Sequence, residues 1–459
     1  MSNNTSVSEL VAKSRAALPA MYEKTQEEVD EIMRVIGKVV HDNAVLLAEM
    51  AVEETRMGNV PDKIAKCKSK SELIYLDLRD KKTVGEIRRD KQRGILEYAE
   101  PVGVVGALIP TTNPAVTAMS NAMFAIKGRN TIILSPHRRA YDTIKKTMDL
   151  MIEVGKEVGL PENAIQMIKT PSREGTRELM SSVDVVLATG GTSMVHAAYA
   201  SGKPSYGVGP GNVPVAIHPT AMLVNAVECI IKGKSYDNGL ICASEQAVFV
   251  QAEQYQQVRD IFISKGSFWV DGADKAKLKD LMWVDGHLNG DIVGQSAERL
   301  AEMAGFEVPE GTRILLVPET KIAPDEIFSK EKLSPVLAMY KYDHWQEAID
   351  GCEAILKNGG EGHSAGIHSK DHDSSRAYAM RMPASRILVN QTTATNAGGS
   401  RENSLVPTTT MGCGSWGNNA TSDNISAEHL INIKRLTFKH AYLRDTSTIF
   451  DNTMFGSET

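Results

Sequence analysis

Short apolar runs alternate with helical stretches along this chain, and this pattern constrains its fold more than any other feature. The runs begin after Gly94 and contain few polar residues. Such runs are typical of strands buried on both faces, and their alternation with helices builds a doubly wound parallel sheet. We therefore predict an α/β fold with a Rossmann-type domain, with strands at 103–110, 130–134, 164–168 and 183–188 and helices at 117–127 and 141–158.

The first 60 or so residues precede this alternation and have a helical pattern. Thr25 and Glu28 have the spacing of a capping box, which satisfies free backbone amides at the start of a helix. Behind them, apolar residues recur every three or four positions, as on one face of a helix. We expect this face to pack against the rest of the protein through Val29, Ile32, Met33, Ile36, Val39 and Val40.

A glycine-rich turn, 189–193, joins the predicted strand at 183–188 to a helix that begins near Met194. Backbone amides at such a strand-to-helix turn point toward a bound anion, and this is how dinucleotide phosphates are held. The turn does not match the GxGxxG fingerprint. It therefore indicates a nucleotide site without identifying the nucleotide.

Composition excludes several classes of protein. With 459 residues, the chain is long enough for two or three domains. Its 51 basic and 57 acidic residues give a net charge of −6, which argues against a nucleic-acid-binding surface. No run approaches a membrane span, and the N-terminus lacks the pattern of a signal peptide, so we expect a cytosolic protein.

The cysteines and histidines indicate neither a disulfide framework nor a metal site. Five cysteines are scattered, so we expect reduced thiols. The nearest approach to a ligand pattern is His363 with His368 and His372, which span a predicted strand and the turn after it. We expect no metal, and we interpret these histidines as loop or core residues, with the adjacent aspartates capping the next helix.

Cys242 is the residue on which a functional hypothesis can be built. It ends the segment Tyr-Asp-Asn-Gly-Leu-Ile-Cys at 236–242 and follows a Gly-Pro loop, 207–212, that contains no carboxylate. These motifs, with those described below, resemble the aldehyde dehydrogenase superfamily, and within it the CoA-acylating branch that holds succinate semialdehyde, acetaldehyde and sulfoacetaldehyde dehydrogenases. The resemblance covers nearly the whole chain.

The resemblance implies thioester chemistry at Cys242. A thiolate with a lowered pKa adds to an aldehyde, hydride leaves toward a nicotinamide, and an enzyme thioester remains. Hydrolytic relatives place a glutamate in the segment that corresponds to 207–212, as general base for water. Because this chain has none there, we expect coenzyme A to accept the acyl group. A hydrolytic enzyme that uses an acid from elsewhere is the alternative.

Other site residues are also carried over from the resemblance. Asn113, in Pro-Thr-Thr-Asn-Pro at 110–114, corresponds to the asparagine whose amide stabilises the oxyanion together with the cysteine backbone amide. Glu331, in Glu-Lys-Leu-Ser-Pro-Val at 331–336, corresponds to the glutamate that binds the nicotinamide ribose. The family's cofactor turn corresponds to Gly190, Gly191 and Thr192.

The adenosine end of the cofactor site departs from the hydrolytic pattern. Where those relatives carry Lys-Pro-Ser-Glu, this chain has Ser135, Pro136, His137 and Arg138. The lysine that contacts the ribose is absent, and arginines at 138 and 139 are able to attract a 2′-phosphate. The sequence therefore leaves both NAD and NADP open as the cofactor.

The C-terminal third carries a second αβ unit, with strands near 336–339 and 387–389, and the segment 407–419 closely resembles the acylating branch. We expect Thr410 in this segment to line the substrate and CoA entrance, and Cys413 to be a buried thiol. Arg401, after Gly-Gly-Ser, is able to hold a carboxylate or sulfonate, or alternatively pairs with Glu402 or faces water. The first reading favours a short anionic aldehyde as substrate, and the overall resemblance is nearest to the succinate semialdehyde and sulfoacetaldehyde enzymes.

The family fold implies a division of the chain into a dinucleotide-binding domain at 1–235, a catalytic domain at 236–425 and a C-terminal segment at 426–459. A hairpin at about 84–102 is expected to pair with this C-terminal segment and to form a homodimer or homotetramer.

Two further functions are alternatives to the oxidation of an anionic aldehyde. They are an acetaldehyde or propionaldehyde enzyme of a metabolic shell and a catalytically idle shell protein.

Overall fold

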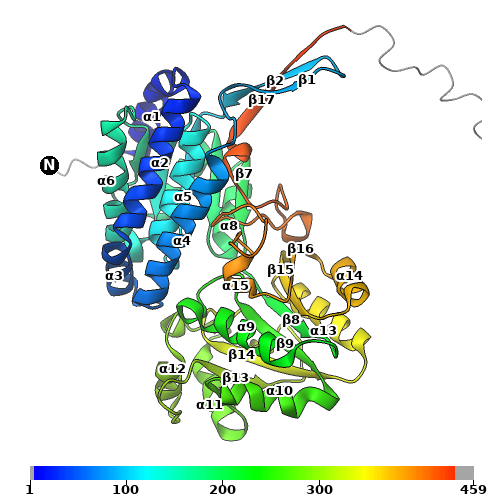
Figure 1. The fold of residues 1–459 in the computed structure, drawn as a ribbon. Coiled ribbons are helices and arrows are strands. Elements are labelled where there is room, and N and C mark those ends of the chain that lie inside the picture. Colours follow the sequence, from blue (N-terminus) through cyan, green and yellow to red (C-terminus); the bar gives the residue numbers. More distant parts are fainter. Residues whose placement is uncertain (1–4, 440–459) are drawn as a thin grey trace, which may run out of the picture.

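The computed structural model describes residues 5–439, and it opens with a layer of four helices (Figure 1). The capping box of Thr25 and Glu28 is confirmed, and Ser6 and Glu9 form a second one. Val29 and Ile32 are fully buried, as predicted, and each such side chain contributes roughly 1.5–3 kcal/mol to stability. The helices are α1 (Val7–Tyr22), α2 (Gln26–Asp42), α3 (Ala44–Thr55) and α4 (Val60–Leu78).

The first sheet has five parallel strands in the order β5-β4-β3-β6-β7. Every residue of β3 and β4 is buried, because helices cover both faces. Helices α2, α5 and α6 pack on one face, and α1, α7 and α8 pack on the other. The elements are β3 (Val104–Ile109), α5 (Pro114–Lys127), β4 (Thr131–Pro136), α6 (Tyr141–Glu157), β5 (Ile165–Met167), α7 (Arg173–Ser182), β6 (Val185–Thr189), α8 (Thr192–Tyr199) and β7 (Ser205–Val208).

The second sheet has seven strands in the order β10-β13-β14-β9-β8-β15-β16, and its neighbours are parallel. With the first sheet, it confirms the predicted α/β class. Its strands are β8 (Val213–Ile217), β9 (Glu245–Gln251), β10 (Ser267–Trp269), β13 (Ile314–Pro318), β14 (Val336–Tyr342), β15 (Gly362–His368) and β16 (Ala384–Val389).

Helices and short elements connect the strands of this second sheet. A two-stranded ribbon, β11 with β12, stands apart from it. The elements are α9 (Leu223–Ser235), α10 (Ala252–Ser264), α11 (Gly272–Met282), β11 (Trp283–Val284), β12 (His287–Leu288), α12 (Ala297–Ala304), α13 (Trp345–Lys357), α14 (His372–Arg381) and α15 (Thr393–Asn396). Short 3-10 turns are η1 (Arg138–Ala140), η2 (Tyr236–Gly239), η3 (Gly290–Ile292), η4 (Ile327–Ser329), η5 (Ser415–Gly417) and η6 (Ala427–Leu430).

A separate three-stranded sheet projects from the body of the protein (Figure 1). It consists of β1 (Gly85–Asp90), β2 (Ile95–Pro101) and β17 (Ile431–Thr437), all antiparallel. The expected pairing of the 84–102 hairpin with the C-terminal segment is therefore observed. The part of that segment after residue 439 lies outside the described residues.

The change from one large sheet to the other occurs earlier than the sequence indicated. We placed the start of the catalytic domain at 236, whereas β8, at Val213, already pairs with β9 and β15 of the second sheet. The carboxylate-free loop at 207–212 is therefore the crossing between the two sheets. Within residues 5–439, no helix combines the length and the apolarity needed to cross a bilayer.

Candidate active site

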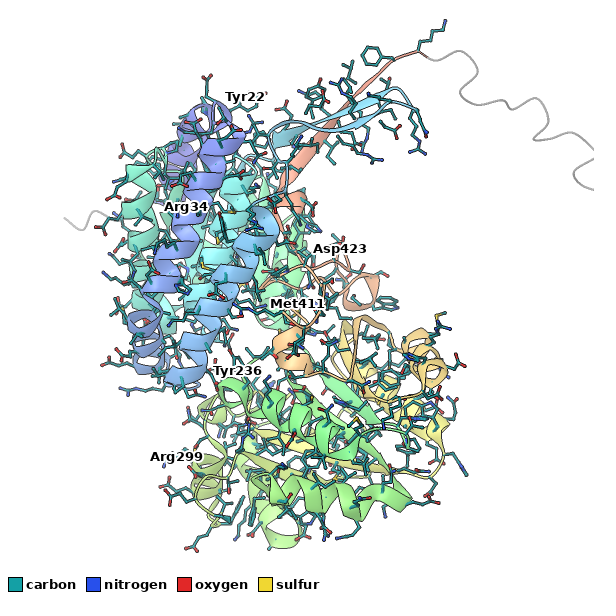
Figure 2. All side chains as sticks on the ribbon, in the orientation of Figure 1. Tyr22, Arg34, Tyr236, Arg299, Met411 and Asp423 are labelled. Atoms are coloured by element: carbon teal, nitrogen blue, oxygen red, sulfur yellow. The ribbon has the colours of Figure 1, made fainter. Side chains whose placement is uncertain are left out.

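A left-handed bend delivers Cys242 to the junction of the two large sheets. Asp237, Asn238 and Gly239 have φ values of 49°, 55° and 74°, a region that Asn, Asp and Gly tolerate best. A Cβ at Gly239 would lie 2.5 Å from the carbonyl oxygen of Ser334, so only glycine fits. Figure 2 shows Tyr236, which opens this bend, between the two halves of the molecule.

Buried charges hold the bend in place. The side chain of Asp237 is fully buried, and its Oδ2 accepts hydrogen bonds from Nζ of Lys63 at 3.0 Å and from Nζ of Lys66 at 2.6 Å. Its Oδ1 accepts from the backbone N–H of Asn59 at 3.0 Å. A strained backbone conformation persists only when its surroundings determine it, and these contacts fix α4 to the approach of Cys242.

Lys66 also connects this cluster to Asn113, the predicted oxyanion residue. Its Nζ donates to Asn113 Oδ1 at 2.5 Å, while Asn113 Nδ2 makes a long 3.3 Å contact with Oγ1 of Thr112. Asn113 is at the start of α5 but its side chain does not cap that helix. Because an amide nitrogen carries two N–H groups, one remains for a ligand. The contact with Lys66 therefore orients Asn113 as a donor.

The loop at 207–212 passes directly beside Cys242. The N–H of Gly211 donates to Glu331 Oε1 at 3.1 Å, and a Cβ at Gly211 would lie 1.8 Å from the carbonyl oxygen of Cys242. Val208, from the same loop, belongs to the small apolar cluster against which Cys242 packs. The structure thus brings Cys242 and Glu331 together, and it places an apolar, carboxylate-free wall against the thiol.

The environment of Cys242 disfavours the thiolate. Burial raises the pKa of its thiol to about 12, and Glu331 and Cys413 add to the rise, whereas Arg386 and the backbone N–H of Ala243 oppose it. Burial also raises the pKa of Glu331 to about 7. We expected a lowered thiol pKa, but the fold holds a neutral thiol beside a carboxyl group whose pKa is raised to about 7.

His363 also lies at this site, although sequence reasoning treated it as a loop or core residue. His363 is fully buried on β15. Gly211 lies between it and Cys242, because a Cβ at Gly211 would lie 3.3 Å from Cδ2 of His363 and 1.8 Å from the carbonyl oxygen of Cys242. Nδ1 of His363 contacts Oγ of Ser364 at 3.1 Å, and its Nε2 has no partner within residues 5–439. Burial, with Arg386, lowers the pKa of His363 to about 3, so the imidazole is neutral.

The other two histidines of the considered metal pattern lie elsewhere. His368 ends β15 and is buried, while His372 begins α14, whose N-cap is Asp371, which accepts from the N–H of Asp373 at 3.0 Å. The described part of the chain contains no group of three or more side chains able to bind a metal ion.

The predicted cofactor residues lie along the carboxyl edge of the first sheet. Its order reverses between β3 and β6, and a crevice at such a switch point is where dinucleotides bind. Gly190 and Gly191 follow β6, and Thr192 begins α8. A Cβ at Gly191 would have no neighbour within 4 Å, so the backbone there has open space before it. Asn113 follows β3 on the other side of the switch point.

The residues at the end of β4 divide into two groups. Ser135 is buried, and its Oγ contacts Oγ1 of Thr176 on α7 at 3.0 Å, so it is engaged inside the domain. His137 and Arg138 are exposed beyond the strand, and Nδ1 of His137 accepts from the N–H of Arg139 at 3.1 Å. Of this group, His137 and Arg138 are accessible to a ligand.

The segment 407–424 joins the first sheet to the second. Thr410 is fully buried, and its Oγ1 contacts Oγ1 of Thr189, at the end of β6, at 3.0 Å. On the other side, the buried Arg386 of β16 donates to the carbonyl oxygen of Gly412 at 2.6 Å. Cys413 is buried, as predicted, and Figure 2 places its neighbour Met411 near the junction of the two halves.

Arg401 and Lys70 occupy contrasting positions near this segment. The Arg401 side chain is 75% exposed, and its Nη2 is 2.5 Å from Oε2 of Glu72. It therefore has a carboxylate partner at the surface, where the sequence suggested either a pocket or pairing with Glu402. Lys70 instead points its Nζ toward the carbonyl oxygens of Gly398 and Gly399, at 2.6 and 3.1 Å.

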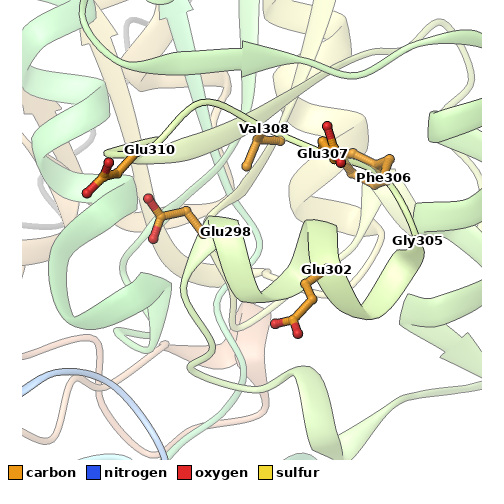
Figure 3. A pocket seen from close by; sticks show the side chains of 7 residues that line it. All are labelled: Glu298, Glu302, Gly305, Phe306, Glu307, Val308 and Glu310. Atoms are coloured by element: carbon orange, nitrogen blue, oxygen red, sulfur yellow. The ribbon is translucent and has the colours of Figure 1, made fainter.

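A surface hollow lies beside α12 and the loop that follows it (Figure 3). Two of its four carboxylates are engaged locally, since Glu298 accepts from the N–H of Gly311 at 2.6 Å and Glu302 pairs with Arg299 at 2.6 Å. This is a solvated acidic surface, and none of its lining residues belongs to the Cys242 site. They are Glu298, Glu302, Gly305, Phe306, Glu307, Val308 and Glu310.

Comparison with known proteins agrees with this geometry. The aldehyde dehydrogenase family model matches residues 1–275. A succinate-semialdehyde dehydrogenase (acetylating) of Clostridium kluyveri is 46% identical over 439 residues, covering 95% of this chain and 97% of the relative. An acetylating aldehyde dehydrogenase structure from Geobacillus thermoglucosidasius has a TM-score of 0.93 at 41% identity, covering 95% of this chain and 96% of that one.

A more distant structure carries both the acyl group and the acceptor. It is a propionaldehyde dehydrogenase of Rhodopseudomonas palustris with bound CoA and an acylated cysteine, and it has a TM-score of 0.86 at 25% identity. The match covers 95% of this chain and 98% of that one. The chain therefore belongs to the aldehyde dehydrogenase family, and within it to the CoA-acylating branch.

Proposed function

We propose that this enzyme oxidises a short anionic aldehyde to its acyl-CoA, reversibly, with NAD or NADP as hydride acceptor. The observation that carries the proposal is the apolar, carboxylate-free loop packed against Cys242. A thioester formed there has no carboxylate in that loop to activate water, and it lasts until the thiol of CoA attacks it.

The residues divide the chemistry among themselves. The Cys242 sulfur adds to the aldehyde carbon, and the oxyanion receives hydrogen bonds from Asn113 Nδ2 and from the backbone N–H of Cys242. The nicotinamide supplies a hydride acceptor, which leaves a thioester on Cys242. The thiol of CoA then attacks the thioester carbon, its sulfur displaces that of Cys242, and its proton ends on the released Cys242 sulfur.

The crevice at the switch point suits the cofactor. The amides of Gly190, Gly191 and Thr192 meet the pyrophosphate at the N-terminus of α8. Glu331 uses Oε1 to accept from Gly211, which leaves Oε2 for a ribose hydroxyl of the nicotinamide half. Exposed Arg138 is available to the adenosine end, where NAD and NADP differ by a phosphate.

The substrate assignment rests on the strongest similarity reported above, which is to a protein named for succinate semialdehyde. Sulfoacetaldehyde has the same arrangement of an aldehyde and a terminal anion at shorter length. Acetaldehyde and propionaldehyde are the neutral alternatives, and they require no cation in the pocket.

The projecting three-stranded sheet is the proposed oligomer contact. Its β17 pairs only with β2 among the described strands, and Ile433 and Leu436 on it are 41% and 46% exposed. An unpaired edge with apolar side chains is a ready template for a second chain. We therefore propose a homodimer or homotetramer, and a cytosolic location remains a prediction.

The deciding experiment follows reduced nicotinamide with each aldehyde, with and without CoA, and with both NAD and NADP. We expect sustained turnover only when CoA is present, with acyl-CoA as the product. Cys242→Ala should abolish turnover while the thermal melting curve stays close to that of the wild type. Sustained turnover without CoA would instead establish a hydrolytic enzyme with a base outside the 207–212 loop.

A further inference from the structure

Lys70 is a partly buried cation that the proposed chemistry does not use. Its Nζ donates to the carbonyl oxygens of Gly398 and Gly399. An ammonium group has three N–H donors, and these two contacts leave one available. Lys70 forms no ion pair with a carboxylate of the described chain, unlike Lys63 and Lys66 on the same helix.

The position of Lys70 places this charge at the reaction site. Lys70 follows Lys66 by one helical turn, so the two side chains share a face of α4, and Lys66 contacts the oxyanion residue Asn113. A negative charge on Cys242 would raise the pKa of Lys70. Gly398, whose carbonyl oxygen accepts from Lys70, packs closely against the 407–424 segment. A Cβ at Gly398 would lie 2.8 Å from the carbonyl oxygen of Thr408. Lys70 is thus near the oxyanion residue, the nucleophile and the 407–424 segment.

Charge balance indicates what such a group binds. An ammonium group partly withdrawn from water, with no carboxylate partner in the described chain, is costly, and desolvation lowers the pKa of Lys70 to about 8, with Lys66 adding to the fall. A carboxylate or sulfonate would supply the missing charge and accept the remaining N–H. A neutral aldehyde would leave the ammonium group without a compensating charge.

We infer that Lys70 binds the anionic end of the aldehyde substrate while the aldehyde carbon stands at Cys242. This inference rests on the proposed function and assigns its specificity to a residue that sequence reasoning did not single out. Arg401, the earlier candidate, is largely exposed and already paired with Glu72. The ligand class is a short aldehyde with a terminal carboxylate or sulfonate.

The test compares Lys70→Met with Arg401→Met, using succinate semialdehyde, sulfoacetaldehyde and uncharged butyraldehyde. We expect Lys70→Met to lower kcat/KM about 100-fold for the anionic aldehyde that the wild type prefers, because a charge-assisted contact is lost. Its kcat/KM for butyraldehyde should stay the same or rise. Arg401→Met should change neither value by more than about threefold, as is usual for an exposed pair.

Several outcomes would overturn the assignment. An equal loss for butyraldehyde would make Lys70 only a tether for Gly398 and Gly399, and a selective loss in Arg401→Met would move the anion to that residue. If Lys70→Met fails to fold, the same comparison is made with Lys70→Gln. The selectivity of the wild type is a further check, because a wild type with no preference for anionic aldehydes contradicts the inference. CoA-independent turnover would refute the proposed acyl transfer, yet the charge comparison among aldehydes would still be measurable.

Discussion

At the residue scale, the site is organised around a thiol that is held neutral. Burial and the nearby Glu331 both disfavour the Cys242 thiolate, and Arg386 only partly offsets them. A neutral thiol resists oxidation and alkylation, because the thiolate is the reactive form. The fold therefore holds the Cys242 thiol mainly in its protonated form.

This environment predicts slow alkylation of Cys242 near pH 7. Below the thiol pKa, each pH unit multiplies the thiolate fraction by about ten, so the rate with iodoacetamide should rise steadily to pH 10. The site of modification is read by peptide mass mapping, with Cys242→Ala as the control. A rate that levels off by pH 7 would show that the thiol pKa is low and that the geometry described here does not govern it.

Glu331 should act on this thiol through its charge. Its carboxyl group, with a pKa of about 7, becomes anionic as pH rises and then raises the pKa of Cys242. Glu331→Gln removes that charge while keeping the shape, so alkylation at pH 8 should be faster than in the wild type. The same variant should raise KM for the nicotinamide cofactor. An unchanged rate of alkylation would show that the charge of Glu331 does not affect the Cys242 thiol.

At the element scale, α4 is the helix that assembles the site. One of its faces carries Lys63 and Lys66 against the bend before Cys242, and Lys70 against the loop at Gly398. A helix can align such residues because positions three and four apart share a face. Helix α4 therefore connects Asn113, the bend before Cys242 and the C-terminal segment.

Lys63 and Lys66 offer a matched pair that separates stability from catalysis. Both lysines donate to Asp237 Oδ2. Lys66 also donates to the side chain of Asn113, whereas Lys63 donates to the carbonyl oxygen of Thr112 at 3.3 Å. Methionine at either position should lower the melting temperature similarly. Lys66→Met should in addition lower kcat by about 10- to 100-fold, because the oxyanion amide loses its orientation.

Double-mutant kinetics check this assignment. The kcat losses of Lys66→Met and Asn113→Ala should be strongly non-additive, because Asn113→Ala removes the donor that Lys66 orients, whereas Lys63→Met and Asn113→Ala should add. Equal kcat losses in the two lysine variants would show that Lys66 acts only by pairing with Asp237 and not by orienting Asn113.

At the scale of the whole molecule, the active site lies between two large sheets, and the projecting sheet extends away from it (Figure 1). The crossing at 207–212 and the segment 407–424 are the two places where the chain joins both halves at Cys242. Catalysis therefore depends on how the two halves are held together, and assembly is expected to depend on β17.

A charge on the exposed edge strand should disrupt assembly without disturbing the site. Leu436→Lys places an ammonium on a residue that is 46% exposed and faces no described neighbour across the outer edge of β17. We expect a smaller species by light scattering than for the wild type, with an unchanged far-UV circular dichroism spectrum. Lys434→Ala, on the same strand and paired with Glu100, is the control. An unchanged molar mass would place the oligomer contact elsewhere.

Local signals in the sequence determined much of the fold. Capping boxes and apolar spacing marked α2, and runs without polar residues marked β3 and β4, because hydrogen bonds and burial of this kind depend on residues a few positions apart. The motif at Cys242 carried its own conformation, since Asp, Asn and Gly are the residues that accept left-handed backbone angles.

Only the tertiary structure decided which distant residues share the site. His363, Lys66 and Lys70 lie on a strand and a helix far from Cys242 in the chain, and nothing in their own neighbourhoods marks them. The crossing between sheets also occurs at 207–212, ahead of the predicted boundary, because β8 gains its partners from β9 and β15. Local propensity decides the type of an element, whereas burial and charge pairing between elements decide which side chains meet, and those interactions exist only in the folded chain.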